Sequence, residues 1–180
     1  MRIRPDKFPE RLRQSFGVST AAGLFGKAHR ELTAYRESND MLRTADHAFN
    51  FCVSAWQLVD WVFKDMSDQE REHVGDYLGK PIKTQTELAI AVQKACPSLK
   101  ICRVIATAGK HVTVDYYPDR TISTALHLDG SHPHYKVRWS LTYAGEICDA
   151  VEIFENALKF WDGLLRRIGW LEAIFVDSQN

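Results

Sequence analysis

The strongest constraint on the fold of this chain is a periodic run of apolar residues near its C-terminus. Between about Cys148 and Ile168, large apolar residues recur in steps of three, four, three, four and three positions. They are Val151, Phe154, Leu158, Trp161, Leu165 and Ile168. This spacing places all of them on one face of an α-helix, and such a face must be buried against other elements. The sequence therefore predicts a helix over 148–168 that packs into a core.

Several earlier segments predict helices that can pack against it. Apolar residues recur at three- and four-residue spacing over 21–35, and residues 39–66 are apolar almost all round. A helix that is apolar on every side belongs in the centre of a domain, so we expect 39–66 to be the central helix. Further helices are expected over about 84–96 and from 97 onward, through the stretch "ICRVIATAGKH" at 101–111.

The boundaries of these helices also have sequence signals. The segment "ESND" at 37–40 predicts a turn, with Ser38 or Asn39 as the N-cap of the central helix. The segment "SDQE" at 67–70 has the capping-box pattern and predicts the start of a short helix. Gly79 and Pro81 follow where that helix should end.

The periodicity changes after residue 120. Apolar and polar residues alternate strictly over 135–143 and more loosely over 122–128, and the turn-forming segment "DGSHPH" lies between them. A two-residue period is typical of a strand with one buried face. We expect an antiparallel β-hairpin at about 121–143 that packs on the helices through Val137, Trp139 and Leu141. The segment "VTVDYY" at 112–117 is a candidate third strand, because an isolated hairpin is only marginally stable.

These patterns predict a mainly α fold, a helical bundle with an added antiparallel β-hairpin. We expect an N-terminal arm over 1–18 and a single helical domain over 19–180. The 180 residues carry 23 basic and 23 acidic side chains, so the charge balance does not indicate a general nucleic-acid-binding field. The four cysteines are widely spaced and no secretory signal or membrane-spanning run is present. We therefore expect a cytoplasmic protein.

A polar arc on the central helix is one candidate site. At 100° per residue, six polar side chains fall within one arc of about 140°. They are Asp46, His47, Asn50, Ser54, Gln57 and Asp60. The arc is either a solvent-facing stripe or a polar seam against a neighbouring helix. In the second case Asp46, Asn50 and Gln57 would line a binding cleft that orients a ligand or a catalytic histidine.

The stretch "ICRVIATAGKH" is the second candidate. On a helix that begins near Ser98, Arg103 and Lys110 lie within about 20° of each other and His111 lies about 80° from Arg103. Arginine and lysine can neutralise a phosphate, and histidine can transfer a proton near pH 7. The alternative is structural, because cations in the last turn of a helix also complement its dipole.

This stretch resembles the motif of the HEPN superfamily, small helical domains in which an arginine precedes a histidine near one end of a late helix. Here the spacer between Arg103 and His111 is seven residues, slightly longer than is usual in the family. The resemblance covers about 19–112 and the last helix. It implies a metal-independent ribonuclease of a toxin or phage-defence type, with Arg103 and His111 as catalytic residues assisted by Lys110. It also implies a homodimer that brings two such sites together.

A third candidate lies at the tip of the hairpin, where His127, His132 and His134 surround Asp129. Histidine and carboxylate are ligands of zinc and nickel, but the spacing matches no known metal motif, and we expect neither a metal nor another cofactor.

Two functional hypotheses result. The first is a HEPN-like RNA-directed protein with RNA as its partner, and the second is a non-catalytic helical interaction module that forms a dimer.

Overall fold

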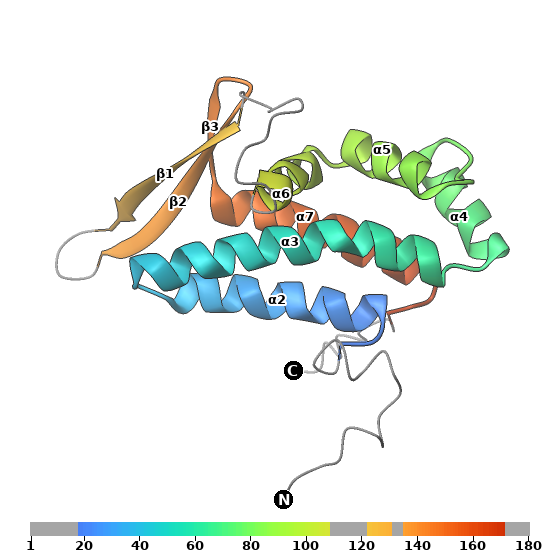
Figure 1. Ribbon diagram of the computed structural model, residues 1–180, viewed down its shortest axis with the longest axis horizontal. Helices are drawn as coiled ribbons and strands as arrows, with labels where there is room; N and C mark the ends of the chain where they lie inside the picture. The colour runs from blue at the N-terminus through green and yellow to red at the C-terminus, as the bar shows by residue number, and fades with distance from the viewer. Residues whose placement is uncertain (1–17, 109–121, 131–134, 172–180) are drawn as a thin grey trace, which may run out of the picture.

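A computed structural model describes residues 18–108, 122–130 and 135–171 of the chain (Figure 1). It confirms a mainly α fold with an added antiparallel sheet. The helices are α2 (Ala21–Glu37), α3 (Met41–Asp65), α4 (Asp68–Leu78), α5 (Gln85–Ala95), α6 (Pro97–Ala108) and α7 (Ala150–Arg167). The strands are β1 (Ile122–Asp129), β2 (Lys136–Tyr143) and β3 (Glu146–Asp149).

The long helices α2 and α3 lie side by side, with α7 packed behind them (Figure 1). α6 packs on α3. The helices α4 and α5 lie toward one end of the bundle, and the sheet lies toward the other end (Figure 1). Among the largest fully buried side chains are Trp161, Tyr35, Phe51 and Phe154. Phe51 of α3 stacks on Phe154 of α7 with ring centroids 4.3 Å apart, and Tyr35 of α2 meets Phe154 edge-on. The predicted C-terminal stripe is therefore the centre of the core.

Most of the predicted helix boundaries are confirmed, and one N-cap prediction is wrong. Ser67 and Glu70 form the expected capping box of α4, and Gly79 ends that helix at φ 71°. The N-cap of α3 is Asp40, whose carboxylate accepts a hydrogen bond from the backbone N–H of Arg43 at 2.8 Å. Ser38, one of the two residues predicted for that position, is instead the C-cap of α2.

The sheet contains the predicted hairpin and an additional strand. In the hairpin, Leu126 of β1 pairs with Trp139 of β2. β3 follows β2 directly through Ala144 and Gly145, whose φ angles of 52° and 88° are those of a tight two-residue hairpin turn. Cys148 lies in this strand, so α7 begins two residues later than predicted, at Ala150. The candidate strand at 112–117 lies outside the described residues.

The hairpin packs on the bundle through its predicted face and through one unexpected residue. Val137 and Leu141 are buried and Trp139 is half-buried against the core, as the alternation predicts. Arg138, on the polar face, is only 6% exposed. Its guanidinium donates hydrogen bonds to the carbonyl oxygens of Arg36 at 2.9 Å, Val137 at 2.7 Å and Ser38 at 3.4 Å. This arginine therefore fastens β2 to the C-terminal end of α2.

Candidate functional site

Arg103 lies on the exposed surface of α6, and its partner is neutral. The guanidinium Nη1 donates a hydrogen bond to the amide oxygen of Gln93, on α5, at 2.8 Å. Gln93 is itself held in place because its amide nitrogen donates to the carbonyl oxygen of Ala89 at 2.8 Å. The glutamine orients the guanidinium without neutralising it. In the described part of the chain this exposed guanidinium has no carboxylate as an ion-pair partner, so a phosphate can reach it.

The segment around Arg103 contains no acidic residue. From residue 88 to residue 114 the chain has no aspartate or glutamate, and it carries Lys94, Lys100, Arg103 and Lys110 together with His111. Lys94 is exposed in the last turn of α5. Lys100, one turn before Arg103, reaches Tyr143 of β2, with its Nζ 3.4 Å from the phenol oxygen. Lys94 and Arg103 are exposed, whereas Lys100 is half-buried. The outer surface of α5 and α6 that carries Lys94, Lys100 and Arg103 is named the α5–α6 face below.

α6 runs antiparallel to α3. The thiol of Cys102 lies against that of Cys52, and one turn later Ile105 shares a cavity with Ala48 and Phe49. The hydrogen bond with Cys52, together with burial, raises the pKa of the Cys102 thiol well above its ordinary value, so the Cys102 thiol is protonated and serves packing. Lys110 and His111 follow the end of α6 at Ala108 and lie outside the described residues.

The predicted binding residues of α3 lie away from α6. Asp46 and Asn50 are exposed and Gln57 is half-buried. At 100° per residue they are rotated about 120–160° around the helix from Cys52, the residue that faces α6. The structure therefore does not bring Asp46, Asn50 and Gln57 together with Arg103. Asp60, another residue of the predicted polar arc, accepts a hydrogen bond from the side-chain amide of Gln85, on α5.

His47 and Ser54, from the same arc, form a polar seam between α3 and α2. His47 Nδ1 lies 2.9 Å from Glu31 Oε2, and Lys27 Nζ donates to Glu31 Oε1 at 3.0 Å. Lys27 also donates to the hydroxyl of Ser54 at 2.9 Å, and that hydroxyl donates to the carbonyl oxygen of Asn50 at 2.7 Å. The polar arc is thus divided, with one part in a hydrogen-bonded seam and one part in solvent. Glu31 and Lys27 carry no sequence signal that identifies them as the partners of His47 and Ser54.

We expect the stability that this seam contributes to depend on pH. Burial alone would raise the pKa of Glu31, but hydrogen bonds from His47 and Lys27 outweigh it and lower the pKa below its ordinary value of 4.5. The folded state therefore binds fewer protons than the unfolded chain in acid, so the stability from Glu31 is complete above pH 4.5 and is lost as pH falls through the lowered value.

We expect Glu31→Gln to be less stable than the wild type near pH 7 and to lose less stability on acidification below about pH 5. Urea unfolding at a series of pH values measures this. Glu37→Gln, an exposed position of the same helix, is the control and should follow the wild-type profile. Parallel profiles for Glu31→Gln and the wild type would contradict the role of the seam.

The third candidate site is only partly described. His127 and Asp129 are exposed on β1, and His132 and His134 lie outside the described residues. Within 18–108, 122–130 and 135–171, no three histidine, cysteine, aspartate or glutamate side chains are grouped as a metal ion would require. In the same part of the chain, no helix combines the length and the apolar character needed to cross a bilayer.

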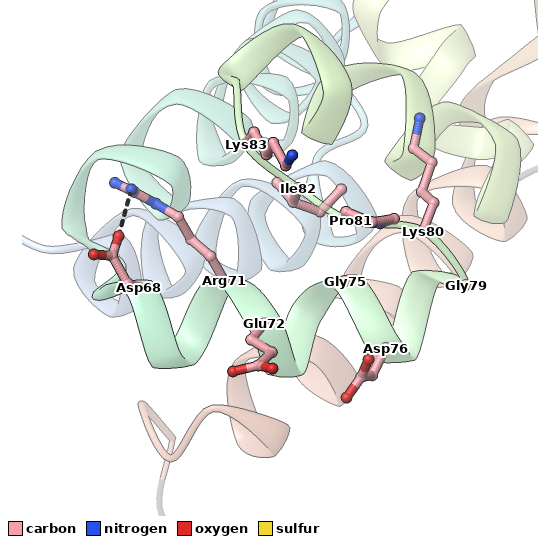
Figure 2. A pocket seen from close by; sticks show the side chains of 10 residues that line it. All are labelled: Asp68, Arg71, Glu72, Gly75, Asp76, Gly79, Lys80, Pro81, Ile82 and Lys83. Carbon is pink, nitrogen blue, oxygen red and sulfur yellow. Dashed lines mark hydrogen bonds and ion pairs between the residues drawn. The ribbon is translucent and has the colours of Figure 1, made fainter.

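A groove of about 760 Å³ lies between α4 and the extended segment 79–83 (Figure 2). Three cations and three carboxylates line it: Arg71, Lys80, Lys83, Asp68, Glu72 and Asp76. Arg71 is already paired with Asp68 at 3.0 Å, and Glu72 and Asp76 point away from the extended segment (Figure 2). Arg71 is therefore already engaged by a carboxylate, which leaves Lys80 and Lys83 as the lining cations that could meet a phosphate chain.

The groove depends on one glycine. Lys80 N donates to Gly75 O at 2.9 Å, and a Cβ at Gly75 would lie 2.9 Å from the backbone oxygen of Lys80. Gly75→Ala should therefore lower the free energy of unfolding by about 2 kcal/mol, since backbone has to shift. Gly26→Ala is the matched control, because its Cβ would approach only the flexible end of Arg30, at 3.5 Å. Gly26→Ala should raise the free energy of unfolding by up to about 1 kcal/mol, because alanine favours a helix more than glycine does. Thermal unfolding compares them, and equal effects at both glycines would contradict the prediction.

The sequence alone did not identify Gln93 as the partner of Arg103. A lone glutamine in a helix has many possible roles, and only the packing of α5 against α6 brings it to the arginine.

Comparison of the chain with protein-family models, with curated proteins and with solved structures found no match.

Proposed function

We propose that this chain is a HEPN-like RNA-directed protein that binds the RNA backbone on its α5–α6 face and cleaves it without a metal. In this proposal Arg103 contacts the scissile phosphate, His111 transfers the proton and Lys110 assists. The observation that carries the proposal is the state of Arg103. It is exposed, it is oriented by the neutral oxygen of Gln93 at 2.8 Å, and it lies in a 27-residue segment, 88–114, without an acidic residue.

The chemistry requires only these residue types. In metal-independent cleavage the 2′-oxygen of the ribose attacks the neighbouring phosphorus, and the bond from phosphorus to the 5′-oxygen breaks. A histidine can accept the proton of the 2′-hydroxyl or supply one to the leaving 5′-oxygen. Negative charge increases on the non-bridging oxygens, and an arginine stabilises it there through charge-assisted hydrogen bonds.

Cleavage of a labelled single-stranded RNA in the presence of EDTA tests the activity. We expect Arg103→Ala and His111→Ala each to reduce the rate by about 100-fold or more, the usual cost of losing such a group. Arg30→Ala is the matched control, because Arg30 is exposed on α2, outside the α5–α6 face. Circular dichroism verifies that each variant is folded. Cleavage at the wild-type rate in both site variants would exclude this site.

A second candidate function is the non-catalytic, homodimeric interaction module. It is favoured by exposed apolar side chains on the hairpin and on the first turn of α3. Leu126 is 41% exposed and Leu128 is 60% exposed on the same face of the sheet as Trp139 and Val137, and Met41 and Leu42 are exposed on α3. An apolar surface of this kind commonly marks an interface. Sedimentation should then show a dimer that Leu128→Glu dissociates, whereas a monomeric wild type would exclude this candidate.

A further inference from the structure

We propose that Gln93 is a positioning residue for Arg103, which it holds so that Nε and Nη2 of the guanidinium are left for two oxygens of one RNA phosphate. The amide oxygen of Gln93 accepts a hydrogen bond from Nη1 of Arg103 at 2.8 Å. This inference rests on the proposed function. It adds a residue to the site and defines the ligand group as a phosphate that accepts two parallel hydrogen bonds.

The orientation of the glutamine follows from its second hydrogen bond. Gln93 is half-buried on α5, and its amide nitrogen donates to the carbonyl oxygen of Ala89, one turn earlier in the same helix, at 2.8 Å. Because the nitrogen is engaged there, the amide oxygen is directed to the arginine. Arginine carries only donors, so this is also the one orientation of the amide that satisfies both partners of the glutamine.

The neutral partner distinguishes Arg103 from other arginines of the fold. In the described part of the chain, three arginines are paired with carboxylates: Arg36 with Glu155, Arg71 with Asp68, and Arg166 with Asp162. A carboxylate competes with a phosphate for the same donors and cancels the charge that attracts it. The amide oxygen of Gln93 orients the guanidinium and cancels none of its charge.

The unoccupied edge of the guanidinium has the geometry that a phosphate requires. An arginine has five N–H donors, two on each Nη and one on Nε. Among the described residues, Nη1 of Arg103 is the atom with a hydrogen-bond partner, which leaves Nε and Nη2 next to each other on one edge. Two parallel N–H groups on one edge match the two non-bridging oxygens of a phosphodiester, the bidentate contact that favours arginine over lysine.

The hydrogen bond from Arg103 to Gln93 should matter more for cleavage than for affinity. An exposed arginine loses rotamer freedom when it binds a ligand, and a hydrogen bond made beforehand removes part of that cost. Stabilisation of the scissile phosphate depends more strictly on position, because the donors must be aligned with the oxygens on which charge develops. Loss of Gln93 should therefore leave the attraction between Arg103 and RNA and impair the alignment.

Two substitutions of similar size separate charge from position. Gln93→Glu places a carboxylate where it can pair with Arg103, and Gln93→Met removes both hydrogen bonds without adding a charge. Glutamine, glutamate and methionine favour a helix to a similar extent, so both variants should fold. Gln69→Glu, at an exposed position of α4, changes the net charge equally outside the α5–α6 face and is the matched control. Anisotropy of a fluorescent single-stranded RNA over a salt series, and cleavage in EDTA, are measured for each variant.

We expect Gln93→Glu to weaken binding as much as Arg103→Ala does, and to reduce the slope of log affinity against log salt by about 0.7, the value for one phosphate contact of a single strand. Gln93→Met should keep the wild-type slope, because the charge of Arg103 remains. It should cleave at least about tenfold more slowly, because a small displacement of a catalytic group has a cost of this order. In an Arg103→Ala background, Gln93→Met should have no further effect.

The possible failures of this inference and of the proposed function are distinguishable. If Arg103→Ala weakens RNA binding while Gln93→Glu and Gln69→Glu have equal affinity and slope, this inference is overturned and the proposed function stands. A further loss of affinity or cleavage from Gln93→Met in the Arg103→Ala background would also overturn it, because Gln93 would then act without the arginine. No RNA binding by the wild type would overturn both.

Discussion

Trp161→Ala should lower the free energy of unfolding by about 4 kcal/mol, the upper part of the range for large-to-small core substitutions. The indole of Trp161 is completely buried, and its Nε1 donates a hydrogen bond to the carbonyl oxygen of Ala55, on α3, at 2.9 Å. The substitution therefore creates a large cavity and removes the side-chain hydrogen bond between α7 and α3. Because Trp161 joins α7 to the central helix, the loss should affect the whole domain rather than one end.

Denaturant unfolding followed by circular dichroism measures this effect. Trp161→Phe is the informative companion, since it keeps most of the ring and removes the N–H; we expect a cost of about 2 kcal/mol. Ile147→Ala is the control, because Ile147 is 77% exposed and its truncation should change stability by less than about 0.5 kcal/mol. A cost for Trp161→Ala as small as that of the control would show that α7 does not pack on α3 as described.

The second large effect is expected at Arg138. Arg138→Met should cost about 3 kcal/mol, because it leaves the carbonyl oxygens of Arg36 and Ser38 without their donor at the C-terminal end of α2. The positive charge there also complements the helix dipole. The guanidinium lies 5.6 Å from the centre of the Tyr35 ring, an additional cation–π contact.

Arg138→Lys distinguishes charge from geometry. Lysine keeps the charge, but its single ammonium group cannot reproduce the fork that reaches the carbonyl oxygens of Arg36 and Ser38 together, so we expect most of the loss to remain. Arg30→Met, on the exposed surface of α2, is the control and should be nearly neutral. Equal stability of Arg138→Met and this control in urea unfolding would contradict the anchoring role.

The fold was predictable wherever one short-range pattern determined the outcome. The stripe from Val151 to Ile168 predicted α7, and the strict alternation over 135–143 predicted β2, because burial of one face imposes those periods. The capping box at Ser67 was predictable for the same reason, since both of its partners lie within four residues. Local signals of this kind need no knowledge of tertiary contacts.

Features that depend on distant contacts were not predictable. Arg138 alternates with apolar residues and therefore looked solvent-exposed, yet the C-terminal end of α2 provides carbonyl oxygens 100 residues earlier in the chain. β3 is only four residues long and has no pattern of its own beyond the Ala144–Gly145 turn. Asp40 replaced Ser38 as an N-cap because neighbouring polar residues compete for one position, and packing decides among them.

The candidate site shows the same division. The sequence predicted a helix through Arg103, and the structure places this arginine on the exposed surface of α6, but the partner Gln93 follows only from the contact between α5 and α6. The angular arc on α3 correctly grouped six polar residues on one side. The arc could not show which of these residues face solvent, because that depends on the position of α2. Side chains of α2 bind His47 and Ser54, whereas Asp46 and Asn50 are exposed.

We expect the α5–α6 face to bind the phosphate backbone of RNA through Arg103. The most direct measurement is the affinity for a fluorescent single-stranded RNA, by anisotropy, over a series of salt concentrations. Each phosphate contact contributes about 0.7 to the slope of log affinity against log salt for a single strand. We expect Arg103→Ala to weaken binding and to reduce that slope by about 0.7, while Arg30→Ala leaves both unchanged. Identical affinity and slope for Arg103→Ala and the wild type, or no RNA binding at low salt, would contradict the claim.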